Sequence, residues 1–240
     1  MEKNEKSSKE ETLHGKCFPG ESPEYRRARN ELLRAESELR RRSEEVAALR
    51  RKLPPGGLVP ENYVFEEATE DGGTREVKIS DLFSPGKDTL LIYSFMYGPN
   101  ESKPCGACAS ILDSLDGTVP HTEQRVNLVA VAKSPLPRIL DFSRKRGWRH
   151  LRILSSANNH YNRDYLAENP DGSQMPILNV FRKDTEGIRH FWGSELLYYP
   201  DEEGRERHVD FIWPIWNLLD VTPEGRGTAW DFPKLSYGPE

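Results

Sequence analysis

Two of the three cysteines lie three positions apart, as Cys105-Gly106-Ala107-Cys108. Such a C-x-x-C pair serves thiol–disulfide exchange, forms half of a metal site, or fills a core. The pair follows the apolar run "TLLIYSF" and opens a segment with helical spacing that we expect to end at Gly117. A thiol at a helix N-terminus meets unpaired N–H groups and the positive end of the helix dipole, which favour thiolate. We therefore expect Cys105 to be the attacking thiol and the more buried Cys108 to be the resolving thiol.

Metal and haem chemistry fit the pattern less well. Cys105, Cys108 and His121 match the C-x2-C-x12-H opening of a zinc finger, but no second histidine follows at the required spacing. If the intervening segment is helical, His121 lies too far from the sulfurs to share an ion with them. Haem attachment requires a histidine directly after the second cysteine, and Ala109 occupies that position. We predict no cofactor and no metal.

Three other interpretations of the cysteine pair stay open. Ser102 and Pro99 lie three and six residues before Cys105, a near match to the peroxiredoxin pattern, in which the proline lies seven residues before. A peroxide-reactive cysteine also needs a positioned arginine, which the sequence does not single out. The pair is otherwise structural, or the protein is a redox-inert interaction module that binds a partner through its helical arm and aromatic surface. Thiolate character at Cys105 distinguishes these classes, because a binding module has no reason to depress its pKa.

Composition limits the partners. Of the 240 residues, 30% are charged and the net charge is −5, which gives no electrostatic case for nucleic acid as a partner. No apolar run approaches the roughly 20 residues that span a bilayer, so no membrane partner is expected. The N-terminal residues lack the apolar stretch of a secretory signal. We therefore predict a cytoplasmic protein, in which C-x-x-C pairs are usually catalytic or metal-binding rather than structural disulfides.

The helices and strands that must position the dithiol are predicted from residues typical of helix ends and from the spacing of apolar residues. Ser22-Pro23 signals a helix start, and apolar residues recur every seven positions from Tyr25 to Leu53, before "PPGG" ends the pattern. This stripe predicts either a homodimer through residues 23–53 or packing on the chain's own domain, although Arg42 interrupts it. Short strands then alternate with helices, which predicts an α/β fold with a mixed sheet flanked by helices. Among these, "PLPRILDFSRKRG" predicts a helix that ends at Gly147, and "VDFIWPIWNLLD" predicts a closing helix. The expected divisions are a disordered tail (1–21), a helical arm and linker (22–57), an α/β domain (58–222) and an irregular tail (223–240).

A proline far downstream completes a known pattern. "QMPILNVFRKD" places Pro176 directly before a strand, and the order of strand, C-x-x-C at a helix start and proline before a strand resembles the thioredoxin superfamily. The resemblance implies a cis Met175-Pro176 bond that faces the dithiol, with the Met175 backbone available to an extended substrate. A trans bond there would defeat the hypothesis of a thioredoxin-like dithiol site and return the C-x-x-C pair to the structural interpretation. In contrast to ordinary thioredoxin, Pro104 stands in place of tryptophan and Ala107 in place of proline.

The likeness narrows to one family. "LLIYSFMYGP", "LDGTVPH", "LSSANNHYNRDY" and "NLLDVTPEGRG" occur in an order that resembles family 899 of the domains of unknown function, described as predicted dithiol–disulfide oxidoreductases. The resemblance covers roughly residues 23–231. It implies thiol–disulfide exchange through a mixed disulfide, with a disulfide-bearing protein or a small thiol as the substrate.

Overall fold

The computed structural model describes residues 13–200 and 207–225, and the chain divides into two units, residues 1–54 and 55–240. The predicted tails at residues 1–21 and 223–240 therefore fall partly outside the described residues. The elements in chain order are α1 (Pro23–Arg51), β1 (Val64–Ala68), β2 (Thr74–Lys78), η1 (Ile79–Leu82), β3 (Thr89–Ser94), α2 (Gly106–Thr122), β4 (Asn127–Ala132), α3 (Leu136–Arg146), β5 (Arg152–Ser155), α4 (Tyr161–Asp164), β6 (Ile177–Lys183), β7 (Ile188–Gly193), η2 (Glu195–Tyr198), η4 (Asp210–Ile212) and α5 (Ile215–Asp220).

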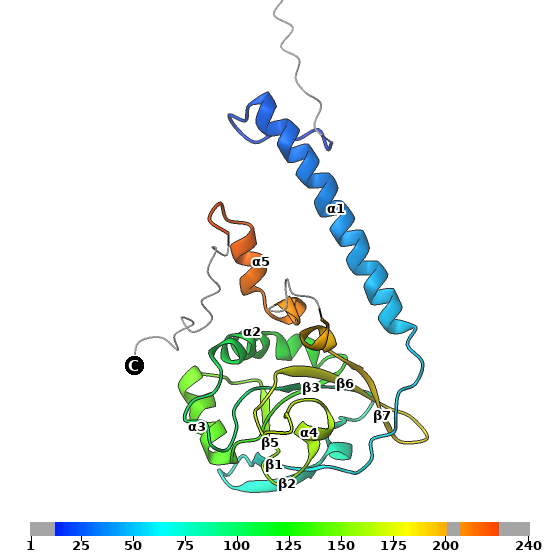
Figure 1. Ribbon diagram of the computed structural model, residues 1–240, viewed down its shortest axis with the longest axis vertical. Helices are drawn as coiled ribbons and strands as arrows, with labels where there is room; N and C mark the ends of the chain where they lie inside the picture. Colours follow the sequence, from blue (N-terminus) through cyan, green and yellow to red (C-terminus); the bar gives the residue numbers. More distant parts are fainter. Residues whose placement is uncertain (1–12, 201–206, 226–240) are drawn as a thin grey trace, which may run out of the picture. The chain divides into compact units, whose positions relative to one another are not determined.

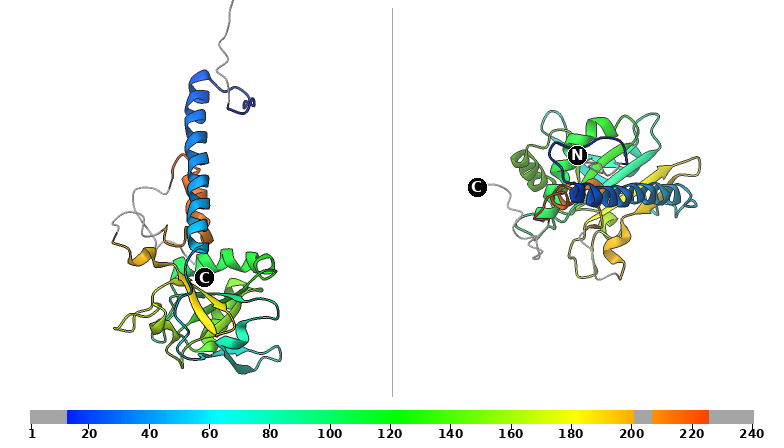
Figure 2. Two further views of the ribbon diagram at one scale, coloured as in Figure 1. Left: turned by 90° about the vertical axis from the view of Figure 1, so that its right-hand side faces the viewer. Right: turned by 90° about the horizontal axis from the view of Figure 1, so that it is seen from above.

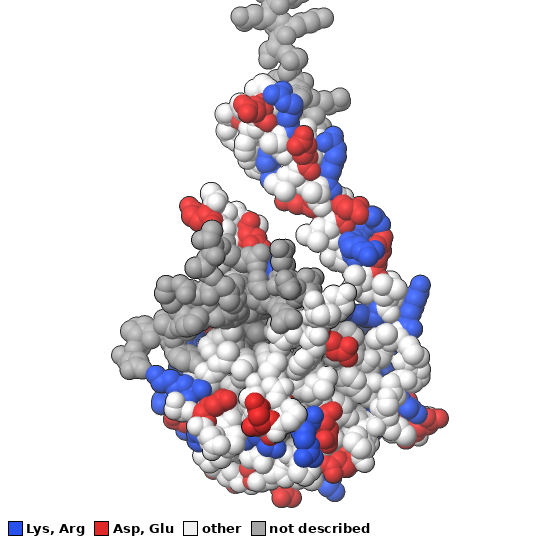
Figure 3. Space-filling view, viewed as in Figure 1, with Lys and Arg blue, Asp and Glu red and all other residues white. Residues whose placement is uncertain are grey.

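The first unit contains the long helix α1, which Figure 2 shows as one straight helix. The Ser22 hydroxyl accepts a hydrogen bond from the Tyr25 N–H at 3.1 Å, and Pro23 occupies the first turn, where its missing N–H costs nothing. Charges of both signs alternate along its surface in Figure 3, and Arg41 pairs with both Glu38 and Glu45. The apolar stripe is exposed within this unit, since Leu39 keeps 68% of its surface accessible.

The second unit is built on a seven-stranded mixed sheet with the order β2-β1-β5-β4-β3-β6-β7 (Figure 1). The pairs β3·β4 and β4·β5 are parallel, and the others are antiparallel. Within it, β3, α2, β4, β6 and β7 form the thioredoxin-like arrangement, with the C-x-x-C pair at the start of α2, after the loop that follows β3. The predicted fold class is confirmed.

Each face of the sheet carries its own hydrophobic core. One core packs α2, α3 and α5 against β3, β4 and β6, and it includes Tyr93, Cys108 and Trp213. The other core lies beneath η1 and α4 and includes Tyr63 and Tyr161. Side chains of β3 alternate between the two, so that Tyr93 belongs to the first core and Ile92 to the second, as the period of a strand requires.

Two helix boundaries differ from the sequence-based expectation. α2 continues past Gly117 and through Pro120 to Thr122, because the buried side chains of Leu115 and Val119 anchor its last turns in the core. The expected closing helix over "VDFIWPIWNLLD" is divided: η4 ends at Ile212, and α5 begins only after Pro214, which is its N-cap. Among the described residues, no helix combines the length and apolar character that a membrane span needs.

Candidate redox site

Cys105 is held at the junction of strand and helix. It is the N-cap of α2, with φ −62° and ψ 130°, and its N–H donates to the carbonyl of Met96 at 2.9 Å. Its own carbonyl accepts the first helical hydrogen bond, from the Ala109 N–H at 3.0 Å. Because Met96 lies two residues beyond the end of β3, the central strand of the fold fixes the position of this cysteine.

The electrostatic surroundings of Cys105 favour its thiolate. Its pKa is lowered to about 6, chiefly because the Cys108 side chain donates a hydrogen bond to its sulfur. The backbone N–H groups of Cys108 and Ala107, in the first turn of α2, lower the pKa further, although neither makes a capping hydrogen bond. Partial burial and the Glu101 carboxylate oppose these effects. The net effect is a lowered pKa, so Cys105, whose side chain is half-buried, is largely ionised at neutral pH.

Cys108 has the opposite character. Its side chain is 1% exposed, and its pKa lies well above the usual range, first because its thiol donates to Cys105 and second because of burial. Two donors instead lower the pKa of Cys108, namely the Tyr93 hydroxyl and the Met96 backbone N–H. Both cysteines are free thiols in this structure. The pair therefore consists of an accessible thiolate and a buried thiol, the combination that sequential attack and resolution require.

The loop that precedes the dithiol is fixed by residues that sequence reasoning missed. Arg138, from α3, donates to the carbonyl of Pro99 at 2.7 Å and to the carbonyl of Glu101, and its guanidinium lies 4.9 Å from the Tyr97 ring centre. The Glu101 carboxylate accepts from the Gly98 N–H at 2.8 Å. These contacts bridge up to 39 positions in sequence, so no local pattern signals them.

The predicted cis Met175-Pro176 bond is wrong, since the described residues contain no cis peptide bond. The Met175 N–H donates to the carbonyl of Ala167 at 2.8 Å, and Glu168 pairs with Gln174 in an antiparallel bridge. The chain therefore enters β6 from a small hairpin, already extended, and the trans form, which is preferred by about 0.5–1 kcal/mol, suits that path. A substrate strand could use the Met175 N–H only after this bond is broken.

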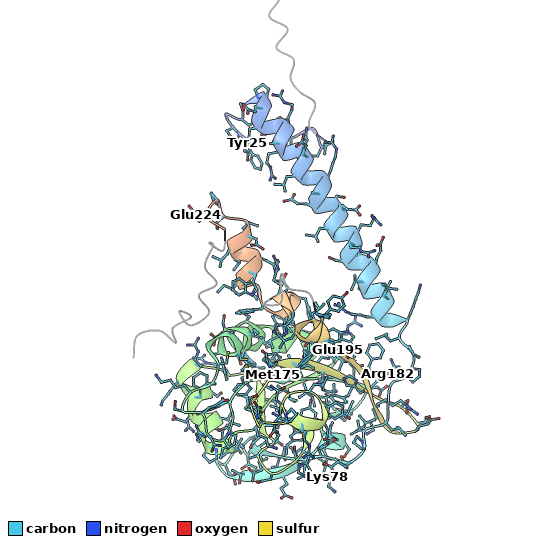
Figure 4. The ribbon with its side chains drawn as sticks, in the orientation of Figure 1. Tyr25, Lys78, Met175, Arg182, Glu195 and Glu224 are labelled. Carbon is cyan, nitrogen blue, oxygen red and sulfur yellow. The ribbon has the colours of Figure 1, made fainter. Side chains whose placement is uncertain are left out.

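The segment Gln174–Pro176 nevertheless lies beside the loop that leads to the dithiol. Ile177 at the start of β6 pairs with Ser94 at the end of β3, so the next position of the register places Pro176 beside Phe95. A Cβ on Gly98 would meet Cγ of Gln174 at 3.3 Å, which confirms the close approach of the two segments. Figure 4 marks Met175 in this segment, where its side chain is half-buried.

The arrangement of Cys105, Cys108 and His121 does not suit a shared zinc ion. His121 lies in the last turn of α2, 16 residues after Cys105, which is about 24 Å along a helix. Among the described residues, no group of three His, Cys, Asp or Glu side chains could hold a metal ion. The dithiol therefore has no third ligand in that part of the chain.

The polar loop around α4 does not cover the dithiol. Tyr161 packs in the core on the opposite face of the sheet from Cys108, in edge contact with Tyr63 at 5.7 Å. A cavity of about 390 Å³ opens on this side and is lined partly by Tyr165, Asn179 and His190. The polar loop of residues 155–165 therefore does not fold over the cysteines, although part of it lines a cavity on the other face of the sheet.

Several solved structures are similar to part of this chain. They include the reduced 2-Cys peroxiredoxin of Plasmodium vivax (18% identity, 56% of this chain and 81% of that chain, TM-score 0.43) and thioredoxin peroxidase I of Plasmodium yoelii (17%, 70% and 91%, 0.45). Peroxidoxin BcpB of Mycobacterium tuberculosis is a third (16%, 67% and 94%, 0.42). Likeness at this level does not bear on activity, and the fold assignment rests on the strand order and register described above.

Sequence relationships give a firmer assignment. No curated protein matches the chain. The family model described as "Bacterial protein of unknown function (DUF899)" matches residues 17–237, which include α1, the whole sheet and the dithiol. The chain belongs to the DUF899 family.

Proposed function

We propose that the protein is a thiol–disulfide oxidoreductase that acts through Cys105 and Cys108. The observation that carries the proposal is the division of the pair into a half-exposed thiolate with a pKa of about 6 and a buried thiol that hydrogen-bonds to it. A cysteine that only fills a core is buried and protonated, and Cys105 is neither. The same thiolate character argues against a redox-inert interaction module.

The reaction consists of two exchanges in which one disulfide replaces another. The Cys105 thiolate attacks a substrate disulfide, a Cys105–substrate disulfide forms, and the first substrate thiolate leaves and takes a proton from water. Cys108 then loses its proton and attacks the Cys105 sulfur, which releases the second substrate thiolate. The substrate disulfide gains two electrons and becomes two thiols, while the enzyme dithiol becomes the Cys105–Cys108 disulfide. The substrate class is a disulfide-bearing protein or a small disulfide.

The trans Met175-Pro176 bond removes one argument for this activity, since the sequence-based criterion assigned a trans bond to the structural interpretation. That criterion rested on a resemblance, whereas thiolate character rests on the surroundings of the sulfur itself. The position of Pro176 beside Phe95 still places a strand-like segment next to the dithiol loop. We therefore give the state of Cys105 more weight than the isomer of the bond.

A peroxide reductase is the second candidate, because one arginine is held against the cysteine loop. Arg138 is committed to the carbonyls of Pro99 and Glu101, so its guanidinium orders the loop rather than standing free beside the sulfur. Cys105 and Cys108 also form a pair that needs no further resolving cysteine. These two features favour disulfides over peroxides as the oxidant.

A comparison of the rates of oxidation by two oxidants tests the proposal. Equal concentrations of glutathione disulfide and hydrogen peroxide are mixed separately with the reduced protein, and formation of the Cys105–Cys108 disulfide is followed by mass spectrometry after acid quenching. We expect faster oxidation by the disulfide, and a trapped glutathione adduct on Cys105 in the Cys108→Ser variant. Faster oxidation by peroxide, with a sulfenic acid on Cys105, would assign the protein to the peroxide reductases. Inertness to both would leave the pair structural.

A further inference from the structure

Tyr93 carries a buried hydroxyl that no hydrogen bond explains. It is the fifth residue of β3 and has 0% of its surface exposed, and its oxygen has no hydrogen-bond partner among the described residues. Buried polar groups are paired in the large majority of cases, and an unpaired one destabilises the folded state. A phenylalanine at this position would avoid that cost, so the hydroxyl requires a reason.

The hydroxyl lies against the dithiol. Tyr93 and Cys108 belong to the same buried cluster, between β3 and α2, and Cys108 is the first group after burial to raise the pKa of Tyr93, followed by Cys105. In the reduced state the Cys108 thiol donates toward Cys105. The Tyr93 hydroxyl acts on Cys108 as a donor and lowers its pKa, although the contact falls short of the geometry of an ordinary hydrogen bond. The Tyr93 hydroxyl therefore lies next to the Cys108 sulfur, which must become a thiolate in the second exchange.

A second donor converges on the same sulfur. The backbone N–H of Met96 also lowers the pKa of Cys108, and Met96 is the residue whose carbonyl holds Cys105 at the helix start. The strand β3 and its continuation thus supply one side-chain donor and one backbone donor to Cys108. The Glu101 carboxylate acts on Cys105 and raises its pKa, so it disfavours a thiolate there.

We propose that the Tyr93 hydroxyl donates a hydrogen bond to Cys108 as this thiol becomes a thiolate, and so accelerates resolution of the mixed disulfide. The inference rests on the proposed thiol–disulfide exchange. In this step the Cys108 thiolate forms a bond to the Cys105 sulfur, the bond between Cys105 and the substrate sulfur breaks, and the departing substrate thiolate takes up the proton that Cys108 released. Tyr93 keeps its own proton throughout, because burial and the two sulfurs hold its pKa far above neutrality.

The chain offers a matched control on the other face of the sheet. Tyr161 is also 0% exposed, and its hydroxyl likewise has no hydrogen-bond partner among the described residues. It belongs to the second core, which does not contain the cysteines. Tyr161→Phe and Tyr93→Phe therefore remove the same atom from equally buried sites, and only the latter site adjoins Cys108.

The test follows both exchanges with one probe, the aromatic disulfide 5,5′-dithiobis(2-nitrobenzoate). Its first coloured thiolate appears when Cys105 attacks, and its second appears when Cys108 resolves the mixed disulfide. All variants carry Cys17→Ser, because Cys17 is exposed and would react independently. We expect Tyr93→Phe to leave the first phase within about twofold of the parent and to slow the second phase at least about tenfold. Tyr161→Phe leaves both phases within about twofold.

Equal second phases in Tyr93→Phe and Tyr161→Phe would overturn the inference while leaving the exchange activity intact. A parent protein that releases no second thiolate would instead overturn the proposed function. A second measurement without turnover uses the Cys17→Ser, Cys105→Ser background and titrates Cys108 by thiolate absorbance. Tyr93→Phe is expected to raise the pKa of Cys108 there by about one unit, the equivalent of tenfold, whereas Tyr161→Phe leaves it unchanged. An unchanged pKa in both would also contradict the inference.

Discussion

Two polar clusters lie at the same end of the sheet and differ in how completely they are hydrogen-bonded. The dithiol cluster (Tyr93, Cys105 and Cys108) lies beneath α2 and leaves the Tyr93 hydroxyl without a partner. The amide network (Ser156, Asn162 and Gln174) lies beside α4. There the Ser156 hydroxyl donates to the Asn162 carbonyl oxygen at 2.7 Å, and the Asn162 amide donates to the Gln174 carbonyl oxygen at 3.0 Å.

The difference indicates a structural role for the amide network and a chemical role for the dithiol cluster. All three side chains of the amide network are 2% exposed or less and use their polar atoms on one another, which fixes Gln174 and hence the start of the segment that enters β6. The dithiol cluster retains an accessible thiolate and an unused donor, which allows charge to move between its sulfurs. Variants of the network should therefore change stability, whereas variants of the dithiol cluster should change chemistry.

The largest effect is expected from Cys105→Ser. A serine hydroxyl is not ionised at neutral pH, so the variant should lose thiol–disulfide exchange by on the order of 10³-fold or more. Glutathione disulfide reduction, coupled to a thiol reductant, measures the loss. The exposed Cys17→Ser variant should retain activity within about twofold. Retained activity in Cys105→Ser would remove this residue from the mechanism.

Removal of the central side chain of the amide network should reduce stability. Asn162→Ala leaves the buried Gln174 carbonyl oxygen without its partner, while the Ser156 hydroxyl keeps the Ala132 carbonyl as an acceptor, so we expect a loss of about 1–3 kcal/mol in the free energy of unfolding. Urea denaturation measures it. The exposed Asn158→Ala, which loses only a 3.4 Å contact with Glu66, should cost less than about 0.5 kcal/mol. An equal cost in both variants would show that the network does not contribute as described.

Stability of the reduced protein should depend on pH through Cys105. Its folded pKa of about 6 lies below the value of about 8.5 for a free cysteine, so the stabilisation is present at high pH and is lost as pH falls through 6. Between pH 6 and 8 the free energy of unfolding should rise by up to about 2 kcal/mol. The raised pKa of Cys108 acts in the opposite sense at higher pH. A Cys105→Ser variant should lose this rise, and a rise of the same size in that variant would assign it to other groups.

The smallest effect on the dithiol is expected from the arm. We propose that the exposed stripe of α1 mediates a homodimer through residues 23–53. In the full chain, Leu32→Glu with Leu39→Glu should shift sedimentation from dimer to monomer, because both side chains lie at repeat positions and are exposed within the first unit. Ser37→Glu, also exposed on the helix but outside the stripe, should leave the dimer unchanged. The rate of Cys105 alkylation should stay within about twofold in all three proteins. A monomeric parent would contradict the dimer.

Residues typical of helix ends predicted most helix boundaries, whereas the geometry of the site depends on contacts between residues far apart in sequence. Ser22-Pro23 and Gly147 mark helix ends through their own conformation, and Gly147 does adopt a left-handed φ of 76°. Gly117 failed as a stop signal because burial of Leu115 and Val119 outweighs the local preference.

The chemistry of the pair was predictable only in part. The place of Cys105 at a helix start follows from the sequence, and its lowered pKa agrees with that expectation. The approach of Tyr93 and Met96 to Cys108 depends on how α2 packs against β3, and the path into Met175-Pro176 depends on the Ala167–Met175 hydrogen bond. Neither arrangement leaves a pattern in the residues that make it.

The pH dependence of alkylation at the two cysteines tests the central claim most directly. The reduced Cys17→Ser protein is treated with iodoacetamide at a series of pH values, and labelling at Cys105 and Cys108 is counted separately by peptide mass spectrometry. The account predicts that Cys105 labels with an apparent pKa of about 6, below the free-thiol value of about 8.5, while Cys108 stays protected. Equal and slow labelling of both cysteines at neutral pH would contradict it, because Cys105 would then have no thiolate with which to attack.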